Sequence, residues 1–513
     1  MKILPPFLLL LLLFLSPLSA QEGEEQGTED KQKEKEKSEK KEEPKEDDQS
    51  ITEHTGIFGG EEIKYTATAG TMVIAKREKE PKASMFYVAY TRSGVEDLKT
   101  RPIVFCFNGG PGSSGVWLHL GGFGPKRVQM TEDGMMPAPP FRLGDNPHSI
   151  LKVADLVFID PVSTGYSRSE DEKKANEFHS FRGDLDSMGE FIRLYTTRNG
   201  RWLSPKFLAG ESYGAFRAAA LANTLHDKFG LYLNGIVLVS GVLSFDTLWG
   251  GDLAFTTFLP ALCETSAYHK KLSEDLLNDP EARRKEVAEF ARGEYATALL
   301  AGARLEGETR DAVAEKVSRY TGIDVETVKK HDLRISASFL REELLRDEGL
   351  VLGRFDSRVT GRDGNLAGSY PGYDPSYAAV FGPFSATLND FVRQDLKFES
   401  DLIYEILSSR VRPWDYGDAF VGKPINVISE LSSVMSENPN LKVMVNCGYQ
   451  DLATPFSAIE HSLDHLSIDP ELLKNIEYTY YEGGHMMYTI EQSNAEWNAD
   501  VAKFIEENSG LAE

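Results

Sequence analysis

A serine of this chain lies in a pattern that could make it a nucleophile. The pentapeptide Gly210-Glu211-Ser212-Tyr213-Gly214 follows an apolar run that begins at Phe207, and an alanine-rich helical pattern from Ala215 to about Phe229 follows it. This order predicts a strand, a sharp turn and a helix, and glycine at both ends of the pentapeptide permits so tight a turn. Because glycine and serine are common, the pentapeptide also arises by chance. Its partners elsewhere in the chain must decide whether Ser212 is reactive.

The partners of a reactive serine are a base that removes its proton and a carboxylate that orients the base. Asp451 follows a strand-like run at 443–446, and His485 follows another at 478–481. Both residues are therefore expected on loops just past strands, where α/β folds place their sites. His461 and His465 are alternative bases, but they lie four apart in a predicted helix, which favours a place on the helix surface.

The elements that must position these residues are strands and helices that alternate along the chain. Weak alternating runs predict antiparallel strands near the N-terminus (63–68, 71–76 and 85–90), and apolar spacing predicts helices at 178–197 and 494–506. Dense apolar runs predict buried strands at 102–107, 156–160 and 235–240, and further sheet strands are expected at 442–446 and 476–481. The alternation predicts an α/β fold with a mostly parallel, doubly wound sheet.

The pattern changes between about Phe245 and Phe398. Segments rich in glutamate, arginine and alanine predict helices at 274–305, 310–319 and 337–347, and a stretch rich in glycine, tyrosine and proline follows at about 364–383. We interpret residues 245–398 as a largely helical cap inserted over the sheet, rather than as an independent domain.

A glycine-rich loop after the first dense strand offers a second chemistry. Gly110, Gly112 and Gly115 form a G-x-G-x-x-G pattern, which in a dinucleotide-binding fold opens a continuous helix. Here the sequence His-Leu-Gly-Gly-Phe-Gly-Pro at 119–125 breaks a helix within a few positions. The loop therefore fits a place beside the serine better than a nucleotide site.

The first residues predict a targeting segment and a linker. Residues 1–20 combine Lys2, an apolar run at 7–15 and small residues before position 21, as a cleavable secretory signal does. A membrane anchor is the alternative, but the apolar run is short for a bilayer. Residues 21–52 hold mainly Glu, Lys, Gln and Asp, which predicts a disordered linker, and the folded domain is expected over 53–513.

Composition limits the possible partners. The 513 residues carry a net charge of −24 at pH 7, and an acidic body argues against nucleic acid or an anionic membrane as a partner. Cys106, Cys263 and Cys447 are few and far apart, so a disulfide framework, a metal site and a cofactor are not expected. The chain has no Asn-x-Ser/Thr acceptor for glycosylation, and with so few cysteines this favours a bacterial periplasm or exterior over a eukaryotic secretory route.

Four segments, in this order, resemble the serine carboxypeptidase family of the α/β-hydrolase superfamily. They are Asn-Gly-Gly-Pro-Gly-Ser-Ser at 108–114, Gly-Glu-Ser-Tyr-Gly at 210–214, Gly-Tyr-Gln-Asp at 448–451 and Gly-Gly-His-Met at 483–486. The segment Asp-Pro-Val-Ser-Thr-Gly-Tyr-Ser at 160–167 resembles the family's D-Q-P-x-x-x-G-F-S without the glutamine. The likeness extends from about residue 60 to the C-terminus.

The resemblance implies a role for each site residue. Ser212 would be the nucleophile, Asp451 the orienting acid and His485 the base. The backbone N–H groups of Gly110 and Tyr213 would form the oxyanion hole. The resemblance assigns Asn108 and Glu211 to hydrogen-bonding the terminal carboxylate of the substrate. Because two ionised carboxylates would repel each other, Glu211 must be protonated when it binds this group.

The sequence departs from the family at Cys106-Phe107, where Trp-Leu is usual, and at Ser113, where a cysteine is common. The expected function is a secreted or periplasmic carboxypeptidase that acts on peptide or protein C-termini, without stable membrane association once the signal is removed. An esterase or acyltransferase on the same scaffold, and a non-catalytic binding protein, are the alternatives. Asn108 and Glu211 discriminate between them, because a plain esterase needs no grip on a carboxylate. The sequence leaves the oligomeric state open.

Overall fold

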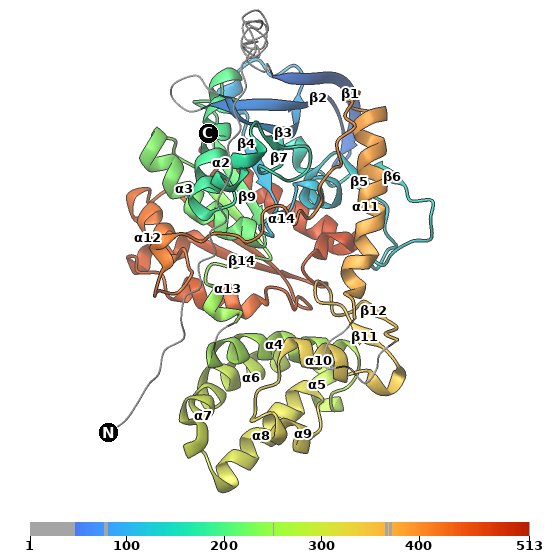
Figure 1. Ribbon diagram of the computed structural model, residues 1–513, viewed down its shortest axis with the longest axis vertical. Coiled ribbons are helices and arrows are strands. Elements are labelled where there is room, and N and C mark those ends of the chain that lie inside the picture. Colours follow the sequence, from blue (N-terminus) through green and yellow to red (C-terminus); the bar gives the residue numbers. More distant parts are fainter. Residues whose placement is uncertain (1–46, 76–80, 250, 365–367, 369–371, 512–513) are drawn as a thin grey trace, which may run out of the picture. The chain divides into compact units, whose positions relative to one another are not determined.

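A ten-stranded sheet organises the chain (Figure 1). The computed structural model describes residues 47–75, 81–249, 251–364, 368 and 372–511. The strands follow the order β1-β2-β3-β7-β4-β9-β10-β13-β14, and β8 pairs with β3. Their bounds are β1 Asp48–Phe58, β2 Glu61–Ala75, β3 Pro81–Arg92, β4 Ile103–Phe107, β7 Asp155–Ile159, β8 Arg168–Ser169, β9 Lys206–Glu211, β10 Gly235–Val239, β13 Lys442–Gly448 and β14 Ile476–Tyr481.

The sheet has an antiparallel edge and a parallel centre, as the sequence predicts. β1, β2 and β3 pair antiparallel with one another and β3 pairs antiparallel with β7, whereas the strands from β7 to β14 pair in parallel. The parallel strands expose their carboxyl ends at one edge of the sheet, where α/β folds place their sites. Two small antiparallel pairs lie outside this sheet: β5 (Lys126–Val128) with β6 (Leu143–Asp145), and β11 (Val351–Leu352) with β12 (Thr360–Gly361).

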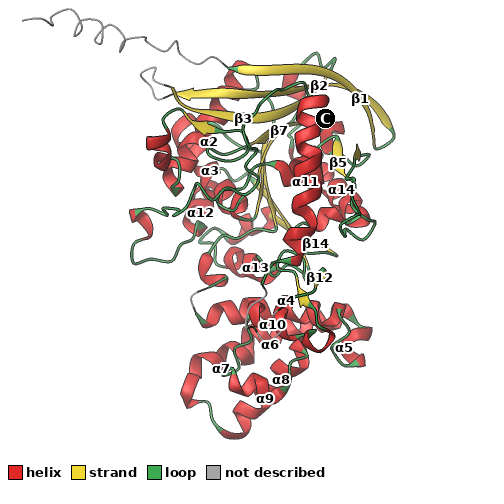
Figure 2. Ribbon diagram, turned by 45° about the vertical axis from the view of Figure 1, so that its right-hand side comes forward, coloured by secondary structure: helices red, strands yellow, loops and turns green. Residues whose placement is uncertain are grey.

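Helices cover both faces of the sheet (Figure 2). Side chains alternate along a strand, so β4 sends Ile103 and Phe105 into one buried cluster and Val104 and Cys106 into the other. The first cluster contains apolar residues of α2 (Phe181–Arg198), α3 (Tyr213–Phe229), α12 (Ile428–Glu437) and α13 (Phe456–Asp464); the second contains those of α11 (Pro375–Gln394) and α14 (Glu491–Asn508). The dense apolar runs of the central strands follow from burial on both faces.

A group of helices is inserted between β10 and α11. We call residues 252–343 the helical insertion. Within it, α4 packs against α6 and α8, and it also contacts α13 of the sheet-covering layer. The buried apolar residues of the insertion join the first cluster, so this segment has no separate core. Its helices are α4 Asp252–Tyr268, α5 Glu274–Asn278, α6 Pro280–Phe290, α7 Ala296–Ala301, α8 Gly307–Thr321, α9 Val325–Lys330 and α10 Ala337–Glu343.

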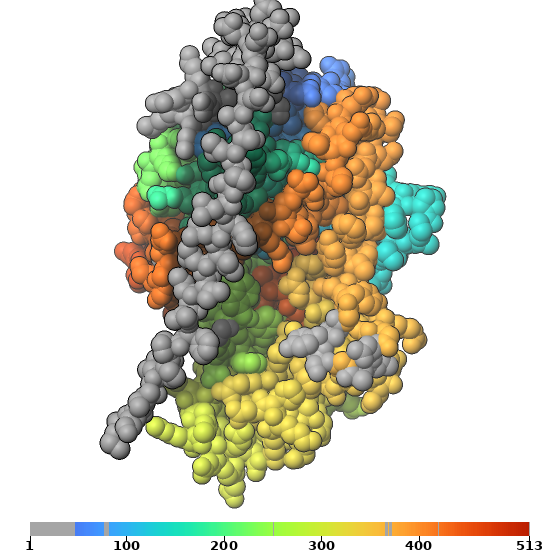
Figure 3. All heavy atoms as spheres, in the orientation of Figure 1, coloured from blue at the N-terminus to red at the C-terminus, as the bar shows by residue number. Residues whose placement is uncertain are grey.

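The predicted end of the insertion at 398 is wrong, because α11 packs with the residues that cover one face of the sheet. Its residues Phe384, Leu388 and Phe391 lie in the second cluster, and Figure 1 shows α11 (orange) beside the sheet. In Figure 3 the orange surface of this segment lies above the yellow surface of the helical insertion. The sequence did not predict this helix because its first half lies in the stretch rich in glycine and proline. Pro375 occupies its first turn, where proline is tolerated, and the packing of its apolar face offsets the break that Pro383 causes inside it.

The predicted linker end at 52 is also wrong. β1 begins at Asp48 and pairs with β2 over its whole length, from Asp48 opposite Thr71 to Phe58 opposite Glu61. Its residues are mostly polar, because this edge strand is exposed along much of its length, so the sequence lacks the apolar alternation of a half-buried strand. The two strands predicted at 63–68 and 71–76 correspond to the single strand β2, Glu61–Ala75, and residue 76 lies outside the described residues.

Residues 1–46 hold the predicted signal peptide and nearly all of the predicted linker, and they lie outside the described residues. Among the helices that the structure describes, none combines the length and the apolar character that crossing a bilayer would require.

Candidate active site

Ser212 lies in a strained turn between β9 and α3. Its backbone has φ +62° and ψ −124°, a left-handed conformation that costs energy for any residue but glycine. A Cβ at Gly210 would lie 2.1 Å from the carbonyl oxygen of Gly214, and one at Gly214 would lie 2.9 Å from that of Phe107. The turn is therefore closed too tightly for any side chain at its two ends. This is the strand-turn-helix geometry that exposes a nucleophilic serine at the end of a strand.

The predicted contact between Asp451 and His485 is confirmed. Asp451 follows β13, His485 follows β14, and the Nδ1 atom of His485 lies 2.7 Å from Oδ2 of Asp451. The backbone N–H groups of Ala453 and Thr454 donate to the other carboxylate oxygen at 2.7 and 3.0 Å, and the Thr454 hydroxyl lies 2.9 Å from Oδ2. Because so many donors surround it, the carboxylate keeps one orientation toward the imidazole.

His485 is buried against Phe355. Its backbone N–H donates to the Phe355 carbonyl at 2.5 Å, and the two rings lie 5.2 Å apart. Burial lowers the pKa of His485, but the charge and hydrogen bond of Asp451, together with the charge of Glu211, outweigh burial, so the pKa is raised overall. The imidazolium that forms when His485 takes a proton is therefore stabilised in place.

Ser212 and His485 line one cavity of about 190 Å³, together with Asn108, Gly110 and Glu211. The alternative bases do not reach it. His461 and His465 lie at the end of α13, with their rings 4.1 Å apart, and they line a different cavity beside Arg292. The structure thus brings together the predicted acid and base and leaves the rival histidines elsewhere.

The glycine-rich loop after β4 lies directly on the turn that holds Ser212. A Cβ at Gly109 would lie 2.4 Å from the backbone nitrogen of Tyr213, so the two backbones touch. Tyr213 is the first residue of α3, where backbone N–H groups lack partners within the helix. The amide of Gly110 donates to no group of the described residues. Two backbone donors are therefore free beside Ser212, as an oxyanion hole requires.

Asn108 and Glu211 form a polar pair on the inner wall of the cavity. Glu211 is buried, and its Oε2 atom accepts a hydrogen bond from the Tyr488 hydroxyl at 2.5 Å. Burial raises the pKa of Glu211 to about 7, although the charge of His485 and the hydrogen bond from Tyr488 lower it. The side-chain oxygen of Asn108 accepts from the Leu118 amide at 3.2 Å, whereas its Nδ2 atom is buried and has no hydrogen-bond partner among the described residues.

Two residues that support this pair have no signal in the sequence. Tyr488 lies three residues after His485 and looks like any core aromatic residue. Arg217 of α3 is buried and donates to the Asn108 carbonyl at 2.5 Å and to Asp184 at 2.7 Å. Its guanidinium also lies over the Tyr213 ring, 5.3 Å from the centroid. Arg217 therefore ties the Asn108 loop to α2 and α3, although arginine in a helix pattern usually indicates an exposed face.

The segment at 160–167 has a structural part in the site. Asp160 accepts from the Gly115 amide at 2.8 Å and from the Tyr404 hydroxyl at 3.1 Å, and a Cβ at Gly165 would collide with its carboxylate. Asp160 thereby fastens the end of the glycine-rich loop to the loop after β7. The G-x-G-x-x-G pattern serves this packing and the contact with Ser212.

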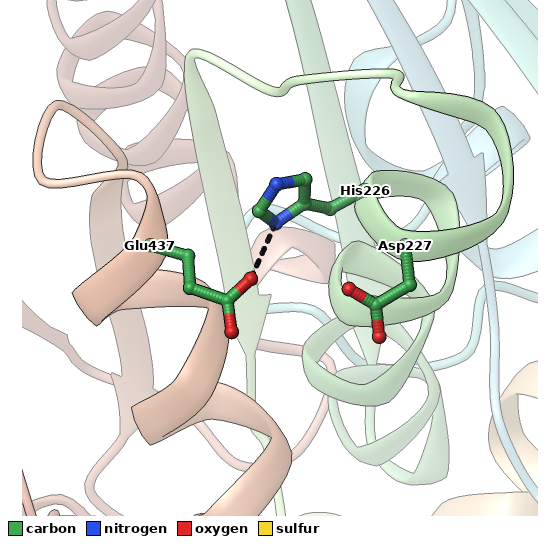
Figure 4. A group of neighbouring side chains, drawn as sticks. All are labelled: His226, Asp227 and Glu437. Carbon is green, nitrogen blue, oxygen red and sulfur yellow. Dashed lines mark ion pairs between the residues drawn. The ribbon is translucent and has the colours of Figure 1, made fainter.

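A surface cluster of metal-ligand residues lies at the other end of α3. His226 and Asp227 of α3 and Glu437 of α12 hold their ligand atoms within 4.8 Å of one another (Figure 4). The imidazole of His226 points toward Glu437, with Nδ1 3.4 Å from its carboxylate, and its Nε2 atom lies 2.7 Å from the Tyr232 hydroxyl. Both acids are exposed, and the contact between His226 and Glu437 is an ion pair only when the imidazole is protonated. The three cysteines are buried and unpaired.

The parallel sheet, the strained serine and the Asp-His pair after the last strands define an α/β hydrolase of the serine type. Residues 62–496 match the family model of the serine carboxypeptidases, and the chain belongs to this family. The solved structure of a prohormone-processing carboxypeptidase from Saccharomyces cerevisiae has the same fold, with a TM-score of 0.54, 18% identity and coverage of 86% of this chain and 91% of that chain.

Relatives with known names match over shorter stretches. The lysosomal protective protein of Mus musculus is 28% identical over 152 residues, which are 29% of this chain and 30% of that protein. Serine carboxypeptidase-like 51 of Arabidopsis thaliana is 33% identical over 185 residues, 34% of this chain and 38% of that protein. The chain thus spans about a third of the curated relatives it matches.

Proposed function

We propose that the chain is a serine-type carboxypeptidase that releases C-terminal residues from peptides through an acyl-enzyme intermediate. The observation that carries this proposal is the place of Glu211, a buried carboxyl group directly beside Ser212 and next to the unpartnered amide of Asn108. A hydrolase of esters or of mid-chain amides needs no such group. A peptide C-terminus offers a carboxylate for it to bind.

The triad would activate Ser212 and later release the product. The contact with Asp451 places a proton on Nδ1 of His485, so Nε2 is free to accept the proton of Ser212. The serine oxygen then attacks the scissile carbonyl, and His485 donates its proton to the leaving amine. Water, activated by the same histidine, would hydrolyse the acyl-enzyme.

Two backbone amides would stabilise the negative oxygen that forms in each step. The N–H groups of Gly110 and Tyr213 are the donors beside Ser212, and neither has to leave another partner first. A preformed pair of donors of this kind typically contributes several kcal/mol to the transition state.

The carboxylate of the substrate would be bound by Asn108 and by protonated Glu211. Because Tyr488 donates to Oε2 of Glu211, the proton of the neutral acid sits on Oε1 and can be donated to the substrate. The buried Nδ2 of Asn108 would be the second donor to the substrate carboxylate. Substrate binding would thus give a hydrogen-bond partner to an amide that has none among the described residues of the free protein. With a pKa of about 7, Glu211 is neutral in acidic solution, where the substrate carboxylate is charged.

We also propose that the chain is exported and acts outside the cytoplasm. The support is the composition of residues 1–20, with a basic start, an apolar run and small residues before position 21.

Ser212→Ala tests the proposed chemistry. Removing a triad nucleophile typically lowers the rate by about 10⁶-fold, and the exchange leaves the packing of the turn intact, so thermal stability should not change. The assay compares a blocked dipeptide with its C-terminal amide. Activity of the variant within tenfold of the wild type would remove Ser212 from the mechanism. Equal hydrolysis of acid and amide by the wild type would favour an esterase or acyltransferase instead.

A further inference from the structure

Two arginines line the catalytic cavity, although the chain as a whole is strongly acidic. Arg354 follows β11 and Arg412 lies in the loop before α12, and both belong to the cavity that contains Ser212 and His485. Among the described residues of this lining, Glu211 is the one carboxylic acid, and it faces Tyr488. The net charge of the chain is −24, so this positive lining is a local feature.

Arg354 is held one ring away from the catalytic histidine. Its guanidinium lies over the Phe355 ring, 4.6 Å from the centroid, and Phe355 in turn lies 5.2 Å from the His485 ring. Its backbone is fixed on both sides, because its N–H donates to Asp374 at 3.0 Å and its carbonyl accepts from the Leu452 amide at 3.1 Å. The cation therefore has a defined place beside the site of proton transfer.

The guanidinium of Arg354 keeps its donors available. Its side chain is 47% exposed, and its nearest carboxylate is that of Asp374, with Nε 3.9 Å from Oδ2. At that separation no hydrogen bond forms, and none of its side-chain N–H groups donates to a residue of the described chain. Asp374 uses its other oxygen, Oδ1, to accept from the amide and the hydroxyl of Ser376, so its contact with the Arg354 guanidinium is an ion pair without a hydrogen bond.

The chemistry of the proposed function decides which part of a substrate meets Arg354. His485 must donate a proton to the amine of the leaving residue, so that residue lies against the imidazole. Its terminal carboxylate is taken by Asn108 and Glu211. Its side chain is left to face the wall formed by Phe355, Tyr377 and Trp117, at whose rim Arg354 lies.

We propose that Arg354 selects leaving residues with an acidic side chain, so that peptides ending in glutamate or aspartate are preferred. This inference rests on the proposed carboxypeptidase function. The planar guanidinium can bind a side-chain carboxylate through two parallel hydrogen bonds, which an amide or an apolar side chain cannot match. The terminal carboxylate and the side-chain carboxylate would thus be bound by two different groups.

The test measures kcat/KM at pH 6 for blocked dipeptides that share one acyl residue and end in Glu, Gln, Leu or Lys. At this pH the side chain of a terminal Glu is ionised and Glu211 is still largely neutral. For the wild type we expect kcat/KM for the peptide ending in Glu to exceed that for the peptide ending in Gln by about three- to tenfold. This range lies between the contribution of an exposed ion pair and that of a hydrogen bond to a charged group. The peptide ending in Lys should have the lowest kcat/KM.

In Arg354→Gln, kcat/KM for the peptide ending in Glu should fall to the value for the peptide ending in Gln. The value for the peptide ending in Leu should stay within twofold of the wild type. Arg354→Lys, which keeps the charge, should retain part of the preference. Arg410→Gln is the matched control, because Arg410 is also 47% exposed and lies outside the cavity lining. Arg410→Gln should keep the full preference. Melting temperatures of all variants establish that each one is folded.

Several results would overturn the inference. Equal release of Glu and Gln by the wild type would overturn it and leave the carboxypeptidase function standing. A loss of equal size in Arg412→Gln would make the preference a property of the whole cavity rather than of Arg354. A preference for Glu at the acyl residue instead of the leaving residue would place Arg354 on the other side of the cleaved bond. No release from any of the four peptides, with ester hydrolysis still dependent on Ser212, would instead reject the proposed function itself.

Discussion

The Tyr488 hydroxyl donates to the Glu211 carboxylate at 2.5 Å, and the two buried residues are 277 positions apart in the chain. Glu211 precedes the candidate nucleophile, and Tyr488 follows the candidate base by three residues. This hydrogen bond therefore joins the two ends of the active site that the sheet brings together. It also favours the ionised form of Glu211, since the phenol donates and the carboxylate accepts.

Tyr488→Phe should raise the pKa of Glu211 further above its present value of about 7. The lost hydrogen bond contributes about 0.5–1.5 kcal/mol to the ionised state, so the alkaline rise in KM for a free-acid dipeptide should move up by about half to one pH unit. Phenylalanine keeps the ring contact with Trp497, whose ring lies 5.2 Å away. Hydrolysis of the matching amide is the control and should keep its pH profile; an unmoved KM profile on the acid would contradict the prediction.

Glu211→Gln should remove the alkaline rise in KM for a free-acid dipeptide. The pKa of Glu211 is raised to about 7, so the neutral form that binds the substrate is complete well below pH 7 and is lost as pH rises through that value. Glutamine cannot ionise, and its amide can still donate to the carboxylate. His485 acts in the opposite sense, because it must be neutral to serve as base, so kcat should fall on the acid side in both proteins.

The measurement is a pair of KM profiles from pH 4 to 9 on the acid and on its amide. The amide profile of the wild type should lack the alkaline rise. If wild type and Glu211→Gln give the same KM profile on the acid, Glu211 does not bind the substrate carboxylate, and the esterase alternative gains support.

Gly109→Ala should disable the site with little loss of folding. The new Cβ would meet three backbone atoms of the serine turn at 2.4 to 2.7 Å, and because backbone cannot move aside easily, the loop must shift away from Ser212. We expect kcat to fall by about 10²–10³-fold, as when an oxyanion donor is lost. Gly293→Ala is the control, since nothing lies within 4 Å of its Cβ, and it should keep full activity. An active Gly109→Ala enzyme would show that the loop does not support the oxyanion.

Removal of the N-terminal segment should be tolerated up to residue 45 but not up to residue 52. A chain that starts at Glu46 keeps β1 and also Asp47, which accepts from the Val73 amide at 2.9 Å and pairs with Arg198 at 2.5 Å. A chain that starts at Glu53 loses those contacts and the first five residues of β1, so its melting temperature should fall by a few degrees. Thermal unfolding of both proteins checks this; equal melting temperatures would show that this end of β1 adds no stability.

The parts of the fold that the sequence predicts are those with strong local patterns. The central strands are buried on both faces, so each reads as a continuous apolar run, and α2 and α3 show apolar residues at helical spacing. β1 has no such pattern, because a polar edge strand is defined by its register with β2 rather than by burial. α11 was missed because its glycine and prolines are tolerated through tertiary packing, which no local signal records.

The residues of the site also fall into two groups, those that a local sequence motif predicts and those that it does not. Ser212, Asp451 and His485 were predictable because each stands in a short motif just after a strand. Tyr488, Arg217 and Arg354 were not, since their roles arise from contacts between distant segments. In a sequence, a buried arginine such as Arg217 cannot be told from one on a helix surface, and burial is what gives it a fixed partner in Asp184.

The last strand of the sheet has a consequence for the order in which the protein becomes active. β14 pairs with β13 at the end of the strand order, and His485 follows it directly. During synthesis from the N-terminus, Ser212 and the glycine-rich loop are complete long before the base exists. In the proposed mechanism the growing chain therefore lacks its base until β14 has docked on β13, and a chain that ends before residue 485 has no catalytic triad.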